Sequence, residues 1–181
     1  MQLNCDSADG WQTDNGDGGK FGDFLAAGKL DTENMKEGTG CLSIAGNDNL
    51  PGTFLSPSAT FMWTGVPVDT GLTQEDGAIR MWIYVSDPAA VGVASKVQIG
   101  SAGGPDVDNY EFILGNSDDP SVCTHTDILT EGWNEITLDL SDAYKVGNPD
   151  LSAVNFIKFY ALIMPADVTV KIDDVRLIKL P

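Results

Sequence analysis

The sequence predicts a single all-β domain folded as an antiparallel β-sandwich, and three observations support this prediction. Many segments alternate between apolar and polar residues, which is the pattern of a strand with one buried face. Clusters of Gly, Asp, Asn and Pro separate these segments and mark turns. No segment keeps a helical spacing of apolar residues, and the 181 residues show neither an internal repeat nor a linker that would divide them into two domains.

The strands are predicted from this alternation. In the clearest segment, residues 79–85, one face carries only apolar residues: Ile79, Met81, Ile83 and Val85. The opposite face of that segment carries Arg80, Trp82 and Tyr84. In chain order, strands are expected at residues 40–45, 61–64, 79–85, 97–101, 109–114, 135–140, 155–163 and 168–173. The turn clusters lie at residues 14–19, 46–52, 103–109, 115–120 and 147–150.

The net charge of −17 excludes two classes of partner. The chain has 27 acidic and 10 basic residues, and 21 of the acidic residues are Asp. Nucleic acids and anionic membranes attract proteins through Lys and Arg, so neither is expected as a partner. No apolar run approaches the ~20 residues of a transmembrane helix, so membrane insertion is not expected. The first residues lack the basic and apolar regions of a signal peptide, and none is expected.

The three cysteines, Cys5, Cys41 and Cys123, leave two arrangements open. One disulfide with a third, free thiol is compatible with the odd number, and so are three buried thiols. The sequence contains no CxxC pair, so it gives little support for zinc or redox chemistry.

Four short motifs, in this order along the chain, resemble a known group of proteins. They are a turn that runs into Trp11 (residues 6–11), a Glu-Gly pair before a strand (residues 30–44), a Gly-Trp-Asn strand (residues 131–141) and a C-terminal strand (residues 170–178). Together they resemble the jelly-roll carbohydrate-binding modules of the galactose-binding-like superfold. The resemblance implies a jelly roll in which the N- and C-terminal strands pair and the Gly-Trp-Asn strand opens the second half.

The same resemblance implies a structural calcium ion where the first strand, the Glu-Gly loop and the last strand meet. The corresponding positions in this chain are acidic: Asp6, Glu37, and Asp173 or Asp174. Calcium takes about six to eight oxygen ligands, which carboxylates from separate loops and backbone carbonyls can supply. In the alternative, Asp6 and Asp9 are turn residues and Asp173 is a solvated strand residue. The acidic segment 14–18 does not fit an EF-hand loop and is interpreted as a turn.

A candidate sugar-binding face lies on the strand at residues 79–85. Proteins hold sugars with flat apolar rings and fixed hydrogen-bonding groups, and Arg80, Trp82 and Tyr84 offer both. If the strand at residues 155–163 lies in the same sheet, three further residues join this face: Gln98, Lys158 and Tyr160. In the alternative, the strand at residues 79–85 is buried on both faces and Trp82 packs under a long loop.

The other tryptophans are interpreted mainly as structural. Trp11 and Trp133 stand where the resembling modules place core or strand-entry residues, so both are expected to support the fold. Trp63 is expected either in a loop at the rim or in the core.

Catalysis is not expected. His125 is the only histidine, and although Cys123 lies two residues before it, no oxyanion hole or nucleophile turn accompanies them. A pair of carboxylates such as Glu111 and Glu135 would be needed for a small β-jelly-roll glycosidase. Such enzymes have clefts paved with Trp and Tyr, whereas only 8% of this chain is aromatic. His125 is therefore interpreted as a loop histidine.

Two functions are predicted from these observations. The first is a non-catalytic carbohydrate-binding or lectin-like adhesion module with a structural calcium, whose partner is a polysaccharide or a cell-surface glycan. The alternative is a virion-surface protein, such as a bacteriophage capsid decoration or tail-associated protein, which would bind glycans or a capsid or tail protein. The start at Met1, the absent signal peptide and the acidity favour the alternative. An extracellular or virion-surface location is expected in either case.

Overall fold

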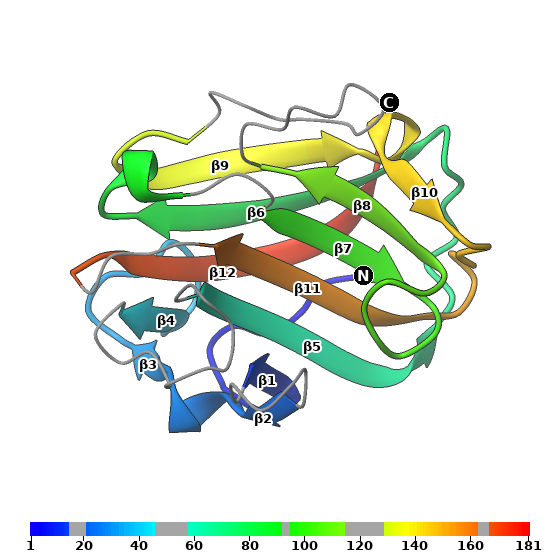
Figure 1. Cartoon of the computed structure of the whole chain (residues 1–181). Helices are drawn as coiled ribbons and strands as arrows, with labels where there is room; N and C mark the ends of the chain where they lie inside the picture. Colours follow the sequence, from blue (N-terminus) through cyan, green and yellow to red (C-terminus); the bar gives the residue numbers. More distant parts are fainter. Residues whose placement is uncertain (15–20, 46–57, 92–94, 115–128, 163–166) are drawn as a thin grey trace.

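Two antiparallel β-sheets pack face to face in a computed structural model of the chain (Figure 1). The structure describes residues 1–14, 21–45, 58–91, 95–114, 129–162 and 167–181. The described helical elements are three short 3-10 turns, η1 (Phe24–Ala26), η3 (Pro88–Ala90) and η4 (Leu140–Asp142). Among the described residues, no helix has the length and apolar character needed to cross a membrane. The predicted all-β sandwich is therefore confirmed.

The first sheet has five strands and contains the C-terminal strand of the chain. Its strands lie in the order β3 (Lys29–Asp31), β4 (Cys41–Ala45), β12 (Thr169–Lys179), β6 (Gly77–Val85) and β9 (Gly132–Asp139). The N-terminal segment runs beside β12, because the Leu3 N–H donates to the Val175 carbonyl at 2.8 Å and the Leu177 N–H donates to the Met1 carbonyl at 2.8 Å. The expected pairing of the two ends of the chain is thus confirmed.

The second sheet has seven strands. In order they are β10 (Tyr144–Val146), β8 (Asn109–Ile113), β7 (Lys96–Gly100), β11 (Val154–Leu162), β5 (Ser58–Val68), β1 (Trp11–Asp14) and β2 (Phe21–Asp23). All eight predicted strands are present in the two sheets. The four strands that alternation did not predict, β1, β2, β3 and β10, have only three or four residues each, which is too short for a period of two to be recognised.

The core lies between the two sheets and is built from the apolar faces predicted by alternation. Ile79, Met81, Ile83 and Val85 of β6 are buried in it. On the core face of the seven-stranded sheet, the rings of Phe61 on β5 and Phe159 on the neighbouring β11 stack with their centroids 6.0 Å apart. The residues between these apolar positions point to the outer faces of the sheets. The candidate site is built from such outward-facing residues.

A bulge in β12 keeps its alternation in phase with the core. Asp173 pairs with Trp82 and Arg176 pairs with Arg80, so β12 has one extra residue between these two pairs. Asp174 adopts a φ of 47°, which a bulge of this kind requires. As a result Val175 is buried in the core, while Asp173 and Arg176 remain on the outer face.

The described cysteines are thiols. Cys5 and Cys41 are both buried and neither forms a disulfide. Burial raises the pKa of each thiol to about 12, so both stay protonated and unreactive at neutral pH. Cys123 and His125 lie outside the described residues.

Candidate functional site

A row of five residues crosses the outer face of the five-stranded sheet, with one residue on each strand. Trp133 on β9 lies opposite Tyr84 on β6, and Tyr84 lies opposite Lys171 on β12. Lys171 in turn lies opposite Ser43 on β4, and Ser43 lies opposite Lys29 on β3. We call Trp133, Tyr84, Lys171, Ser43 and Lys29 the cross-strand row. Because neighbouring strands are ~4.8 Å apart, the row is about 19 Å long.

One end of the cross-strand row is aromatic. The rings of Tyr84 and Trp133 meet edge to face, with their centroids 5.6 Å apart and their planes at 67°. The Trp133 indole N–H donates to Asn34 Oδ1 at 2.9 Å, which holds the ring in place. Both side chains are half-buried and so still present apolar surface to solvent.

Trp133 was not expected at this site. The family resemblance gave it a structural role, whereas the structure places it on the outer face beside Tyr84. Alternation contained the signal that would have found it. Since Ile136 and Leu138 face the core, the residues at odd numbers in β9 face outward, and extending this pattern back from Glu135 reaches Trp133.

The middle of the cross-strand row is an ion pair. Lys171 Nζ lies 2.7 Å from Asp31 Oδ2 and 5.0 Å from the centroid of the Tyr84 ring. Only 6% of Lys171 is exposed. Burial of the Asp31 carboxyl raises its pKa, but the Lys171 ammonium and two backbone N–H groups outweigh this effect and lower the pKa to about 2. The Asp31 carboxyl is therefore ionised at neutral pH.

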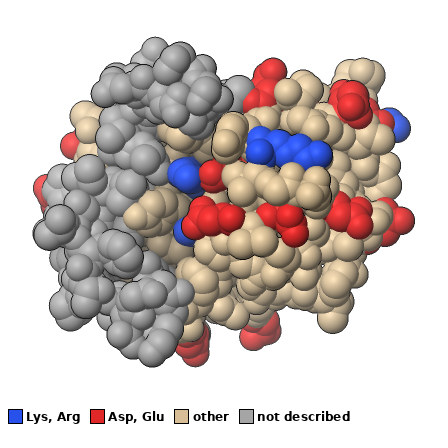
Figure 2. All heavy atoms as spheres, turned by 45° about the vertical axis from the view of Figure 1, so that its right-hand side comes forward, with Lys and Arg blue, Asp and Glu red and all other residues tan. Residues whose placement is uncertain are grey.

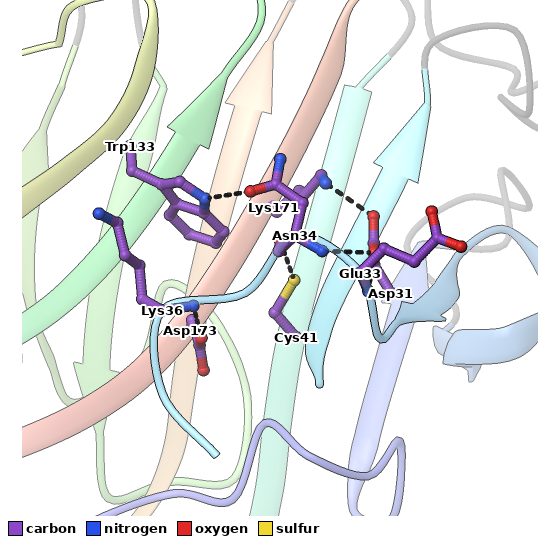
Figure 3. A network of polar contacts seen from close by, with 8 residues as sticks. All are labelled: Asp31, Glu33, Asn34, Lys36, Cys41, Trp133, Lys171 and Asp173. Atoms are coloured by element: carbon purple, nitrogen blue, oxygen red, sulfur yellow. Dashed lines mark hydrogen bonds and ion pairs between the residues drawn. The ribbon is translucent and has the colours of Figure 1, made fainter. Parts of the chain in front are cut away.

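The loop between β3 and β4, residues 32–40, crosses the outer face beside the cross-strand row (Figure 3). Asp173 anchors this loop, because its Oδ2 accepts hydrogen bonds from the Lys36 and Glu37 N–H groups at 2.8 and 3.0 Å. Desolvation raises the pKa of the Asp173 carboxyl even though three backbone N–H groups favour its charged form. The Lys36 ammonium lies 4.5 Å from the centroid of the Trp82 ring.

Arg80, Trp82 and Tyr84 share the outer face of β6, as their alternation predicts. Arg80 Nε lies 3.7 Å from Glu135 Oε1 on the neighbouring strand. The sequence left open whether Trp82 belongs to a binding face or packs under a long loop, and the structure has features of both. Trp82 faces outward, but Lys36 from the loop at residues 32–40 covers its ring. Of these three residues, Tyr84 is the one that belongs to the cross-strand row and lines a pocket beside it.

The expectation that Gln98, Lys158 and Tyr160 join this face is wrong. These residues lie on β7 and β11 in the seven-stranded sheet, because β11 pairs with β5 and β7 and not with any strand of the five-stranded sheet. Gln98 is 1% exposed and donates to Glu111 Oε2 at 3.0 Å. Lys158 Nζ lies 4.7 Å from the Tyr160 ring centroid. They form a second polar cluster on the opposite side of the sandwich.

The two carboxylates considered for glycoside hydrolysis also lie on different sheets. Glu111 is on β8 in the seven-stranded sheet, whereas Glu135 is on β9 in the five-stranded sheet. Both point away from the core that separates the sheets, so they do not face a common cleft.

Two other tryptophans lie at the core. Trp11 is 4% exposed and lies in the core, which confirms its structural role. Trp63 packs against the core, which is one of the two positions expected for it.

The four residues predicted to bind calcium line a single pocket of about 470 Å³: Asp6, Glu37, Asp173 and Asp174. Calcium prefers oxygen ligands, so the chemistry of these side chains suits the ion. Asp6 and Asp174 already accept hydrogen bonds from other groups, however, since Asp6 Oδ1 accepts the Gly40 N–H at 2.8 Å and Asp174 Oδ1 accepts the Gln2 amide at 2.9 Å. Over the described part of the chain, no three Asp, Glu, His or Cys side chains form a group that could hold a metal ion.

A second pocket, of about 250 Å³, lies at the Lys29 end of the cross-strand row. Four of its lining residues belong to the row: Lys29, Ser43, Tyr84 and Lys171. The others are Asp31, Ala45, Ser86, Asp167 and Thr169. The outer face of this sheet thus combines exposed aromatic surface with a polar pocket, and it is the candidate functional site of the described chain.

No protein-family model and no curated protein sequence matches the chain. Among solved structures it is similar to the family 30 carbohydrate-binding module of a cellulosomal cellulase from Clostridium thermocellum, with a TM-score of 0.56, 17% identity, and coverage of 98% of this chain and 95% of that one. Another family 30 carbohydrate-binding module gives a TM-score of 0.56 at 16% identity, covering 99% of this chain and 87% of that one.

A third similar structure is the K1 cleaved adhesin domain of Lys-gingipain from Porphyromonas gingivalis W83. It has a TM-score of 0.55 and 14% identity, and the match covers 98% of this chain and 96% of that one. At these identities the likeness concerns the fold. The chain therefore has the jelly-roll β-sandwich fold of the carbohydrate-binding modules.

Proposed function

We propose that this protein is a non-catalytic carbohydrate-binding module that binds a polysaccharide or a cell-surface glycan on the outer face of its five-stranded sheet. The observation that carries the proposal is the cross-strand row, in which the half-exposed rings of Tyr84 and Trp133 adjoin the buried Lys171–Asp31 ion pair. Aromatic rings contact the C–H groups of a sugar, and fixed charged groups bind its hydroxyls. The fold shared with carbohydrate-binding modules supports the same function.

The charge of the protein favours a neutral glycan over an acidic one. The net charge is −17, and Asp and Glu side chains are spread over the face seen in Figure 2, where Lys and Arg form only separate spots. Within the row itself, the ammonium of Lys171 is already paired with Asp31. A glycan rich in carboxylates or sulfates would be repelled at long range and would find little net positive charge at the site. Because the proposed partners, polysaccharides and cell-surface glycans, lie outside cells, we infer an extracellular location.

Structural calcium at the pocket of Asp6, Glu37, Asp173 and Asp174 is a separate proposal. Its support is that four acidic residues, predicted from distant parts of the chain, line one pocket. Glycan binding at the cross-strand row does not depend on it. The virion-surface alternative stays a prediction of the sequence, since no contact in the described structure favours it.

Affinity electrophoresis tests the proposed function. The protein is run through gels that contain β-1,4-galactan, mixed-linkage β-glucan or galactomannan, and at least one polysaccharide is expected to retard it. Tyr84→Ala and Trp133→Ala should each weaken that binding by at least about 10-fold, the effect of removing a central aromatic contact. Tyr144→Ala is the matched control, because Tyr144 is an exposed tyrosine on β10 in the other sheet.

Two results would contradict the proposal. No retardation of the folded protein by any of these polysaccharides would argue against glycan binding. Retardation that is lost in Tyr160→Ala and kept in Tyr84→Ala would move the binding site to the seven-stranded sheet.

A further inference from the structure

The pocket at the Lys29 end of the cross-strand row contains polar groups with unused hydrogen-bonding capacity. Lys171 has three N–H donors, of which one meets Asp31 and another side of the ammonium faces the Tyr84 ring. Asp31 Oδ2 accepts only from Lys171 among the described residues, so one of its lone pairs is left. A donor and an acceptor that are 2.7 Å apart are therefore both available at the pocket wall.

Ser43 supplies a third polar group. Its side chain lies between Lys171 and Lys29, is completely buried, and its Oγ has no hydrogen-bond partner in the described part of the chain. A buried hydroxyl without a partner is costly, so such a group points to something that binds it. Lys29 lies directly opposite on β3 and is exposed, and both residues line the pocket.

We propose that this pocket binds one sugar residue through two hydroxyl groups on neighbouring carbon atoms. This inference rests on the proposed function and identifies the chemical class of its ligand. One hydroxyl donates to Asp31 Oδ2 while the adjacent hydroxyl accepts from Lys171 Nζ, and the Ser43 hydroxyl completes the contacts of the second. The pocket volume of about 250 Å³ is below the ~300–1,000 Å³ of sites for larger organic ligands, and it suits a single ring.

Other ligands satisfy the pocket less well. A carboxylate or sulfate would bind Lys171 but would lie against Asp31 and Asp167, and an ammonium group would meet Lys171 and Lys29. A single hydroxyl would leave either the donor or the acceptor of the ion pair unused. A sugar chain that leaves the pocket along the row passes over Tyr84 and Trp133, whose rings contact its next residues.

Periodate provides the direct test, because it cleaves the bond between two carbon atoms that both carry hydroxyls. Native β-1,4-galactan, mixed-linkage β-glucan and galactomannan are compared with the same polymers after periodate oxidation and borohydride reduction. We expect the protein to bind at least one native polymer and to lose most of that binding after the treatment. Undiminished binding to the treated polymer would overturn the inference and leave the proposed function intact.

A substitution that removes one oxygen atom tests the site itself. Ser43→Ala should not lower thermal stability and should tend to raise it, because a buried hydroxyl without a partner costs free energy; it should weaken binding about 2- to 10-fold, the loss of one hydrogen bond. Thr60→Val is the matched control, since Thr60 also carries a buried hydroxyl without a described partner but lies in the seven-stranded sheet. Equal affinities of wild type and Ser43→Ala would overturn the inference. If no native polymer binds, the proposed function fails as well.

Discussion

Asp31 and Lys171 are separated by 140 residues in the chain, and their side chains meet at 2.7 Å across strand β4. The contact joins the edge strand β3 to the central strand β12, and it places a fixed carboxylate and a fixed ammonium beside the Tyr84 ring. Because Asp31 also accepts the Glu33 and Asn34 N–H groups, the same carboxylate holds the start of the loop that crosses the face.

The contribution of this ion pair to stability depends on pH. The pKa of Asp31 falls from 3.8 to about 2 on folding, so the folded state binds this proton less tightly than the unfolded state. The stabilisation is therefore complete above about pH 5 and is lost as the pH falls through 4 toward 2. After a reduction for solvent screening, we expect Asp31→Asn to lower the free energy of unfolding by about 1–2 kcal/mol at pH 7.

Urea unfolding of wild type and Asp31→Asn between pH 7 and pH 2 measures this contribution. The two curves should converge as the solution becomes acidic, because wild-type Asp31 is then protonated. Asp142→Asn removes an exposed carboxylate on η4 and serves as the control for the loss of one negative charge. A difference between wild type and Asp31→Asn that stays constant down to pH 2 would contradict the assignment.

Gly38 is required by the close approach of Asp6. It has a φ of 63°, and a Cβ at this position would lie 2.3 Å from both Asp6 carboxylate oxygens. Gly71 has almost the same φ, 64°, but no atom within 4 Å of such a Cβ. Gly71→Ala should cost about 1–2 kcal/mol for the left-handed backbone alone. Gly38→Ala should cost about 1–3 kcal/mol more, because it adds a steric clash.

Thermal or urea unfolding of the two alanine variants separates the two effects. The pair is matched in backbone conformation, so the difference between them reports the contact with Asp6. Equal destabilisation by both substitutions would mean that Asp6 moves aside without cost.

Local alternation predicted the outward residues of the candidate site because side-chain direction in a strand depends only on neighbouring positions. Arg80, Trp82 and Tyr84 were found in this way. The order of the strands depends on which distant segments pair, and alternation carries no information about that. For this reason the sequence placed Lys158 and Tyr160 on the wrong sheet, although it identified their strand and the direction in which they point.

The contacts made by loops could not be predicted from the sequence either. The segment at residues 32–40 has no periodic pattern, so nothing indicated that Lys36 would cover Trp82 or that Asn34 would bind Trp133. Ser43 was missed for a different reason. A serine in a strand is unremarkable until the register shows Lys171 and Lys29 on either side of it and the structure shows its hydroxyl without a described partner.

Lys36 protects the Trp82 ring from solvent. A cation over an indole at an exposed site contributes about 0.5–1 kcal/mol, so Lys36→Ala should lower the free energy of unfolding by that amount. The same substitution uncovers the ring, and quenching of tryptophan fluorescence by acrylamide should increase. In a Trp82→Phe background Lys36→Ala should produce a much smaller increase, because the indole ring under the Lys36 ammonium is then absent. An increase of equal size in both backgrounds would contradict this arrangement.

Calcium is expected to raise the melting temperature if it occupies the pocket of Asp6, Glu37, Asp173 and Asp174, since a cation there offsets the repulsion among neighbouring carboxylates. Binding only to the folded state, at a concentration 100-fold above Kd, stabilises by about 2.7 kcal/mol, which corresponds to roughly 5–10 °C for a chain of this length. Differential scanning fluorimetry in calcium chloride and in EDTA measures the shift.

The shift should disappear in Asp6→Asn, because the substitution keeps the size of the side chain and an oxygen that accepts the Gly40 N–H but removes the negative charge. Asp142→Asn, which removes an exposed carboxylate far from this pocket in the sequence, should keep the shift. Identical melting temperatures of the wild-type protein in calcium and in EDTA would contradict the calcium proposal. Glycan binding that persists in EDTA would then show that the cross-strand row is organised by its own contacts, the Lys171–Asp31 pair and the Trp133–Asn34 hydrogen bond.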